Sequence, residues 1–186
     1  MGLVYFYPYY IYKMKKSLTV TLFIVCVFQF SHAQSPYQLL VEKPNEKTYK
    51  GILTQELLLN DTTFKWYAQN LKGYKPNKAA LAGLKKYADS IQLLVFMGTW
   101  CEDSHAIIPK FYALLDSAGF SKKRVTLIGV DRDKKTFSHL AEALAIKNVP
   151  TIIVIKNGKE TGRVIEYGKF GLYDIELGDI FKKMDN

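Results

Sequence analysis

Trp100-Cys101-Glu102-Asp103-Ser104 is the stretch that decides the fold of this chain. The stretch Ile91 to Met97 precedes it and is apolar except for Gln92, and such runs are typical of strands buried on both faces of a sheet. We expect Cys101 to open a helix that continues to about Ser117. Unpaired backbone N–H groups and the partial positive charge at a helix N-terminus favour the thiolate, which is the nucleophilic form of cysteine. The stretch therefore predicts a reactive sulfur on a strand–turn–helix unit.

The chain after this helix alternates between strands and helices. Buried strands are predicted at 125–130 and 151–155, a helix at 136–146 between them, a returning strand at 162–166 and a closing helix at 172–184. Asn157-Gly158 is a strong hairpin turn signal. Parallel strands need helical crossovers, whereas a tight turn delivers an antiparallel edge strand. The predicted fold is α/β, with a central mixed sheet flanked by helices.

Residues 34–90, named here the N-terminal extension, precede this pattern. We expect two short strands in 34–60, although 52–59 fits a strand or a short helix equally well. The cluster Asn60-Asp61-Thr62 predicts a capped helix at 63–71, and a second amphipathic helix is predicted at 78–88. The extension should pack on the domain that follows, because its larger apolar side chains need burial: Leu57, Leu59, Phe64, Trp66 and Leu81.

Residues 14–33 have the pattern of a secretory signal. Met14-Lys15-Lys16 is a basic start, and an apolar stretch and a small-x-small cleavage site at 31–33 follow it, which predicts Gln34 as the first mature residue. Residues 1–13 fit a segment before the true start codon, with translation beginning at Met14. We expect an exported, periplasmic protein. The alternatives are secretion from the cell, or an uncleaved signal that anchors the protein in the membrane.

The chain has two cysteines, and Cys26 lies in the predicted signal. Cys101 would then be alone in the mature protein, so no internal disulfide could form. The formal net charge is +9, but the lysines are scattered among acidic residues and form no basic stripe. We therefore expect no nucleic-acid partner. The three histidines are far apart in sequence, and no metal site or cofactor is expected.

Residues 91–185 resemble the thioredoxin fold in element order and in four local features. A buried strand delivers Trp100-Cys101 to a helix start, and Pro109 follows eight residues after the cysteine, where thioredoxins carry a helix-kinking proline. Val149-Pro150-Thr151 looks like the family's cis-proline entry to a strand, and Lys156-Asn157-Gly158-Lys159 resembles the hairpin after it. The resemblance implies a thioredoxin-like three-layer sandwich at 91–186 behind the extension.

The resemblance also implies which residues form the site. Cys101 and Ser104 would lie at the reacting centre, and a client polypeptide would bind at Trp100 and at 149–151, that is, Val149, Pro150 and Thr151. Ser104 stands where the family carries its second, resolving cysteine. Val95 and Leu127 stand where thioredoxins carry a buried acid and its lysine partner. These departures speak against dithiol reductase activity.

Several polar residues have two interpretations. Ser104 could donate a hydrogen bond to the Cys101 thiolate, or be an ordinary polar residue of the first helical turn. His105 could be a base or a cationic stabiliser, but helical geometry should point its side chain away from Cys101, so we expect it on the solvated surface. We expect residues 131–133 to be charges that cap a loop rather than ligands of a metal. Arg163 and Glu166 would form a surface pair without chemistry.

The sequence thus predicts an exported monothiol protein that forms mixed disulfides through Cys101. Its partners would be client proteins with cysteines or disulfides, and small thiols; a membrane enters only if the signal is uncleaved. Disulfide isomerisation, deglutathionylation or client capture fits one thiol better than net reduction does. The alternative is a redox-silent peptide-binding module, with Cys101 incidental.

Overall fold

A computed structural model describes residues 35–43 and 46–185 of the chain. The predicted signal at 14–33 and the proposed start at Met14 lie outside the described residues. From Pro36 onward the chain forms one compact unit. In the described part, none of the helices has the length and apolar character needed to cross a bilayer.

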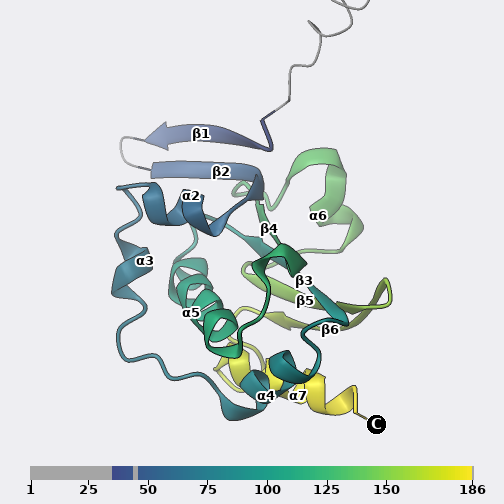
Figure 1. Cartoon of the computed structure of the whole chain (residues 1–186). Coiled ribbons are helices and arrows are strands. Elements are labelled where there is room, and N and C mark those ends of the chain that lie inside the picture. Colours follow the sequence, from purple (N-terminus) through teal and green to yellow (C-terminus); the bar gives the residue numbers. More distant parts are fainter. Residues whose placement is uncertain (1–34, 44–45, 186) are drawn as a thin grey trace, which may run out of the picture. The chain divides into compact units, whose positions relative to one another are not determined.

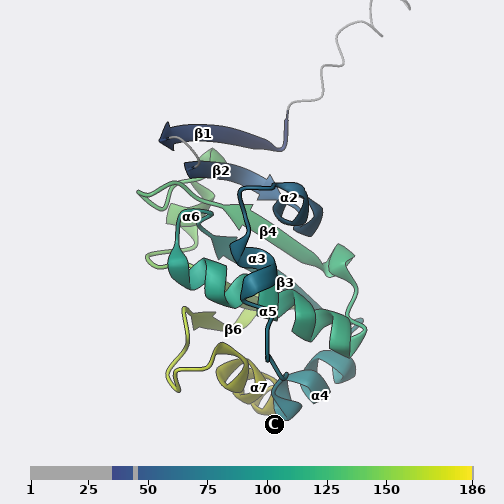
Figure 2. The same ribbon diagram turned by 90° about the vertical axis from the view of Figure 1, so that its left-hand side faces the viewer.

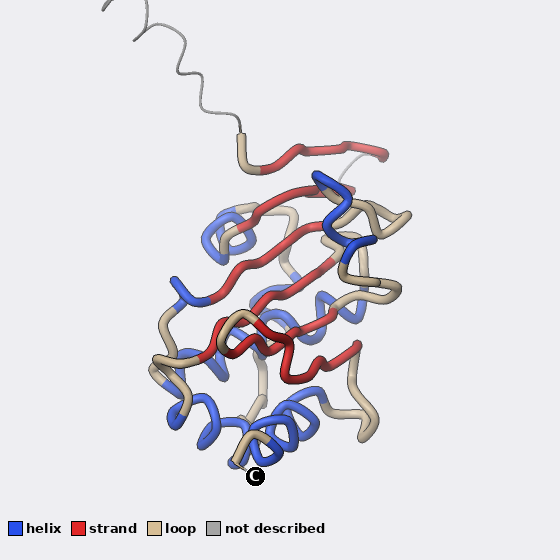
Figure 3. The backbone as a smooth tube through the Cα atoms, turned by 90° about the vertical axis from the view of Figure 1, so that its right-hand side faces the viewer, coloured by secondary structure: helices blue, strands red, loops and turns tan. Residues whose placement is uncertain are grey.

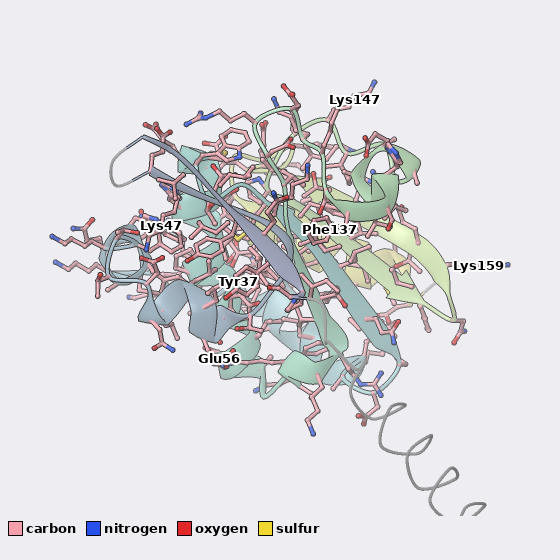
Figure 4. All side chains as sticks on the ribbon, turned by 90° about the horizontal axis from the view of Figure 1, so that it is seen from above. Tyr37, Lys47, Glu56, Phe137, Lys147 and Lys159 are labelled. Carbon is pink, nitrogen blue, oxygen red and sulfur yellow. The ribbon has the colours of Figure 1, made fainter. Side chains whose placement is uncertain are left out.

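A six-stranded mixed sheet runs through this unit, in the order β1-β2-β4-β3-β5-β6. Only the β3–β4 pair is parallel, and the other pairs are antiparallel. The strands are β1 (Tyr37–Lys43), β2 (Glu46–Leu53), β3 (Ile91–Met97), β4 (Val125–Gly129), β5 (Thr151–Lys156) and β6 (Lys159–Ile165). Figure 3 shows them side by side, and Figure 4 labels Tyr37 and Lys159 on the two outermost strands. The predicted mixed sheet is confirmed.

Helices cover both faces of the sheet (Figures 1 and 2). The core on one face includes residues of α4 (Lys78–Lys86), α5 (Glu102–Ala118) and α7 (Tyr173–Lys183), together with α2 (Gln55–Asn60) and α3 (Trp66–Gln69). The smaller core on the other face includes α6 (Leu140–Ala143). Two short 3-10 helices, η1 (Lys122–Arg124) and η2 (Phe137–His139), complete the fold. The layers are those of the predicted three-layer sandwich.

Strand β3 supplies side chains to both cores. Leu93 and Val95 pack in the larger core, whereas Phe96 packs in the smaller one with Leu94 beside it. Successive side chains of a strand point to opposite faces, so the apolar residues 93–97 can pack in both cores at once. The buried run identified in the sequence is therefore the central strand, and its end delivers the chain to Cys101.

The N-terminal extension joins the sheet through two facing glycines. Gly51 of β2 is the register partner of Gly129 of β4. A side chain at Gly129 would collide with the Tyr49 carbonyl oxygen, and one at Gly51, where φ is +118°, would meet the Pro36 carbonyl. The absence of a side chain at Gly129 thus allows β2 to lie against β4, and at Gly51 it leaves room for the backbone of Pro36. The extension becomes part of the sheet.

Some predicted boundaries in the extension were wrong or unresolved. The stretch 52–59, which fitted a strand or a helix, contains the end of one and the start of the other: β2 ends at Leu53, and α2 begins at Gln55. Thr54 caps this helix, and its hydroxyl accepts a hydrogen bond from Leu57 N at 3.2 Å. The helix predicted at 63–71 shrinks to the four residues of α3. Leu59, expected to be buried, is 55% exposed.

The helix predicted at 136–146 is also much shorter than expected. It consists of η2 and the four residues of α6, since Ser138 and His139 adopt left-handed backbone conformations with φ of 54° and 52°. Such residues cannot continue a right-handed helix. The crossover from β4 to β5 is therefore mostly loop.

Candidate functional site

Cys101 occupies the N-cap of α5, where β3 hands the chain to the helix. Its side chain is half-buried, and it is the free cysteine of the described residues. The Sγ atom donates a hydrogen bond to the Val149 carbonyl oxygen at 3.2 Å. The Val149–Pro150 peptide bond is cis. Two segments 48 residues apart in sequence thus meet at the sulfur.

A tight turn presents the sulfur. Cys101 N donates to the Gly98 carbonyl at 3.0 Å, and His105 N donates to the Cys101 carbonyl at 3.0 Å as the first bond of the helix. Ser104 is fully buried, and its Oγ accepts a hydrogen bond from Gly98 N at 3.2 Å. Ser104 lies in the first turn of α5, as the second interpretation has it, and the hydrogen bond of its hydroxyl is to the Gly98 backbone.

Apolar side chains occupy the two positions at which the resemblance to thioredoxins would place a buried acid and its lysine partner. Val95 and Leu127 are direct register partners in β3 and β4, and Ile152 of β5 faces Val95 on the other side. All three are buried, with at most 2% of each residue exposed. No titratable group among them could take a proton from a neighbour at position 104.

The side chains of Val149 and Thr151 are also buried. Thr151 Oγ1 donates to the Asn148 carbonyl at 2.7 Å, and the Pro150 carbonyl accepts from Glu166 N at 2.7 Å. Pro150 is buried too, so all three residues predicted to bind a client at 149–151 have little side chain to offer. A client would meet the backbone of this segment next to the sulfur.

Trp100 is half-buried and fixed on the other side of Cys101. Its Nε1 donates to the Val130 carbonyl at 3.0 Å. The Arg132 guanidinium lies 5.3 Å and the Lys134 ammonium 5.7 Å from the ring centroid, both within cation–π range. The indole is thus partly covered by two cationic side chains.

Asp131 closes the loop that carries these cations. Its Oδ1 accepts hydrogen bonds from the backbone N–H groups of Asp133 and Lys135, and its Oδ2 lies 2.7 Å from Lys50 Nζ. Burial works against the charged form, but Lys50 and these N–H groups hold the pKa of Asp131 below its usual value. The interpretation of residues 131–133 as loop-capping charges is confirmed for Asp131.

Tyr167 is a neighbour of the site that the sequence did not reveal. It follows β6 and is 38% exposed. Burial raises the pKa of its hydroxyl, as do the charge of Asp103 and a hydrogen bond to that carboxylate. Cys101 and Glu102 act on it in the same direction. Nothing in the pattern around residue 167 signals this contact, which arises from the path of the chain after β6.

His105 does not lie on the solvated surface. Its ring stacks on Trp66 of α3, with centroids 4.3 Å apart and planes 12° from parallel. Its Nε2 lies 2.7 Å from the Thr99 carbonyl oxygen. Burial lowers the pKa of His105, and the bond to Thr99 offsets part of that effect. The predicted surface position was wrong because its covering group, Trp66, comes from the N-terminal extension.

Arg163 was also assigned the wrong partner. It forms a paired contact with Glu160, with both N···O distances at 2.6 Å, and its Nη1 reaches the Leu144 carbonyl at 3.0 Å. Glu166 follows the end of β6 and its φ is +53°, so the strand geometry expected for the pair does not extend to it. Across the described ranges, no group of three acidic, histidine or cysteine side chains could hold a metal.

Comparison with known proteins gives one family match. The thioredoxin family model matches residues 79–170, which run from α4 to the loop after β6. A thioredoxin of Echinococcus granulosus is 29% identical over 87 residues, which cover 47% of this chain and 76% of that protein.

Two solved structures match this chain at low identity and low TM-score. The oxidised thioredoxin O2 of Arabidopsis thaliana is 20% identical, with a TM-score of 0.37, covering 58% of this chain and 85% of its own. A protein of unknown function from Pseudomonas aeruginosa is 16% identical, with a TM-score of 0.42, covering 64% of this chain and 80% of its own.

Proposed function

We propose that this chain, which matches the thioredoxin family model over residues 79–170, is an exported monothiol protein that engages clients through mixed disulfides at Cys101. The supporting observation is the place of the sulfur. It lies at the N-cap of α5, half-buried, 3.2 Å from the backbone that leads into Pro150. An incoming disulfide can reach it there, while a serine occupies the position of the resolving cysteine.

The proposed exchange has two steps. The Cys101 thiolate attacks one sulfur of a client disulfide, that S–S bond breaks, and the other client sulfur leaves with the electron pair as a thiolate. A second thiolate, from the client or from a small thiol, then attacks the mixed disulfide and releases Cys101 as a thiolate. When the client supplies that second thiol, its disulfide is rearranged and no electrons are gained or lost.

The binding residues follow from the same geometry. The backbone of 149–151 would face the client segment bonded to Cys101, and Trp100 would contact it from the other side. Ser104 would act through the turn, since its Oγ holds Gly98 N at 3.2 Å. The proposed location is an oxidising compartment outside the cytoplasm, where client disulfides exist. The signal-like residues 14–33 support that location.

Trapping in cells expressing the full chain tests the proposal. Mixed disulfides recovered with the wild type should disappear in Cys101→Ala, because no other sulfur of the mature protein can form them. Ser117→Ala changes an exposed serine of the same helix and should keep them. Mass spectra of the trapped protein also give the mature N-terminus, expected at Gln34.

Two results would contradict the proposal. Mixed disulfides that persist in Cys101→Ala would show that they form elsewhere. A folded wild type whose Cys101 fails to react with a thiol reagent at neutral pH would instead favour the redox-silent peptide-binding module.

A further inference from the structure

Thr99 is where the N-terminal extension holds the turn that presents Cys101. The residue is 3% exposed. Its hydroxyl donates to the Lys47 carbonyl at 2.8 Å and accepts from Tyr49 N at 3.0 Å. Strand β2 pairs with β4 only from Gly51 onward. Before that point, the Thr99 hydroxyl binds backbone groups of β2, at Lys47 and Tyr49. The extension thereby fixes the side chain two residues before the sulfur.

His105 fixes the same residue from the helix side. Its Nε2 lies 2.7 Å from the Thr99 carbonyl oxygen, and a carbonyl can only accept, so Nε2 carries the proton. The backbone N–H of His105 already donates to the Cys101 carbonyl at 3.0 Å. One residue therefore holds the turn at two points, on either side of Trp100.

Trp66 in turn holds the imidazole. The two rings are stacked at 4.3 Å. Trp66 packs on Phe64, with centroids 5.3 Å apart, and Phe64 packs on Tyr49 at 5.8 Å. Tyr49 is also the residue whose N–H donates to Thr99. The aromatic contacts and the hydrogen bonds thus connect the extension to the turn at both Thr99 and His105.

We propose that His105 is a positioning residue for the Cys101 thiol, and that the N-terminal extension holds it in place through Trp66. The inference rests on the proposed thiol exchange. With its hydroxyl held by β2 and its carbonyl held by His105, Thr99 cannot shift, and Cys101 stays at the helix N-cap beside the Val149 carbonyl. Without the Nε2–H donor, the Thr99 carbonyl loses its partner and the turn can move. A misplacement of about 1 Å can cost a reacting group about 100-fold in rate.

Two amide substitutions test this inference. His105→Gln places an N–H donor near the position of Nε2, whereas the shorter His105→Asn cannot reach the Thr99 carbonyl. We expect the second-order rate constant of Cys101 with a small aromatic disulfide to stay within about twofold of wild type in His105→Gln and to fall about tenfold in His105→Asn. His139→Asn is the matched control, because that side chain is 91% exposed and its left-handed backbone suits asparagine.

The rates are compared at denaturant-free conditions where circular dichroism shows each variant fully folded. Trp66→Leu provides a second test. It keeps the Nε2–H donor of His105 but removes the ring stacked on the imidazole, and it should also slow the reaction of Cys101 with the disulfide. Equal rates in wild type, His105→Asn and Trp66→Leu would overturn the inference and leave the proposed exchange intact. An unreactive Cys101 in the wild type would overturn both. If His105→Asn does not fold, a Trp66→Leu rate equal to that of wild type still refutes the role of the extension.

Discussion

Ser104 leaves Cys101 without a second thiol in the same site to resolve a mixed disulfide. The residue is buried in the first turn of α5, and its hydroxyl accepts a hydrogen bond from Gly98 N. A hydroxyl cannot attack a disulfide as a thiolate does. We predict that Ser104→Cys supplies an internal resolving thiol, lowers the trapped mixed disulfide about tenfold and gives measurable insulin reduction with a regenerating reductant. Turnover should remain slow, since Val95 and Leu127 offer no group to deprotonate the new thiol.

The control for this variant places the second thiol out of reach. Ser117→Cys adds a cysteine near the other end of the same helix. It should retain the mixed disulfide and lack insulin reduction. Equal trapping by wild type and Ser104→Cys would show that position 104 cannot resolve the bond.

Some residues of the site could be predicted from the sequence and others could not. Cys101 stands out because a helix start and a buried strand flank it, and the Val149-Pro150 segment because of its likeness to a known motif. Tyr167 and the Trp66–His105 stack depend on contacts between distant segments. His105 lies 39 positions after Trp66, and helical geometry alone cannot say what covers a given helix face. The mistaken partner of Arg163 has a local cause: β6 ends before Glu166, and the guanidinium binds Glu160, three residues away.

Among the elements, the β2–β4 junction depends most directly on the absence of a side chain. A Cβ at Gly129 would collide with the Tyr49 carbonyl oxygen, which belongs to backbone and cannot rotate away. We predict that Gly129→Ala lowers the free energy of unfolding by about 1–3 kcal/mol, the usual cost of overpacking. Denaturant titration measures this change, and hydrogen exchange should show faster exchange at the Tyr49 amide, which donates to Thr99.

Gly162→Ala is the corresponding control on β6. Its added methyl would meet the side chain of Ile180 at 3.0–3.2 Å, and a side chain can adjust. The loss of stability should be smaller and should leave exchange at β2 unchanged. An unaltered unfolding free energy in Gly129→Ala would mean that β2 can withdraw from β4 at no cost.

Elements with strong local patterns were predictable, and those shaped by contacts were not. The apolar run of β3, the hairpin at Asn157-Gly158 and the long helix α5 depend on local features of the chain. The short α3 follows from Asp61, which binds Lys47 Nζ at 2.8 Å and Tyr49 Oη at 2.9 Å and ties the loop to β2. Its Oδ1 also accepts from Thr63 N at 3.0 Å, so the expected capping cluster forms a turn instead.

At the scale of the whole molecule, stability should depend on His105 in mildly acidic solution. Burial lowers the pKa of His105 in the folded state, with part of the effect offset by Thr99. An unfolded chain has a histidine pKa of about 6.5, so below that pH the unfolded state binds more protons. The stability is full above about pH 6.5 and is lost as the pH falls toward the folded-state pKa.

His105→Gln cannot titrate in this range. We predict that its free energy of unfolding falls less than that of wild type between about pH 7 and pH 5, as measured by denaturant titration at each pH. His139→Gln is the control, because it removes an exposed histidine and should leave the pH dependence of the unfolding free energy as in wild type. A parallel decline in wild type and His105→Gln would assign the acid sensitivity to other groups.

The insertion of β2 beside β4 has a consequence for how the chain can be divided. A fragment trimmed to the family match, residues 79–170, would lose β1 and β2, so β4 would become an edge strand that is paired only with β3. The unpaired backbone groups of an exposed edge strand can pair with strands of other chains and promote aggregation. The segment that carries β1 and β2 therefore covers this edge of β4, and recombinant work on the domain should keep that segment attached.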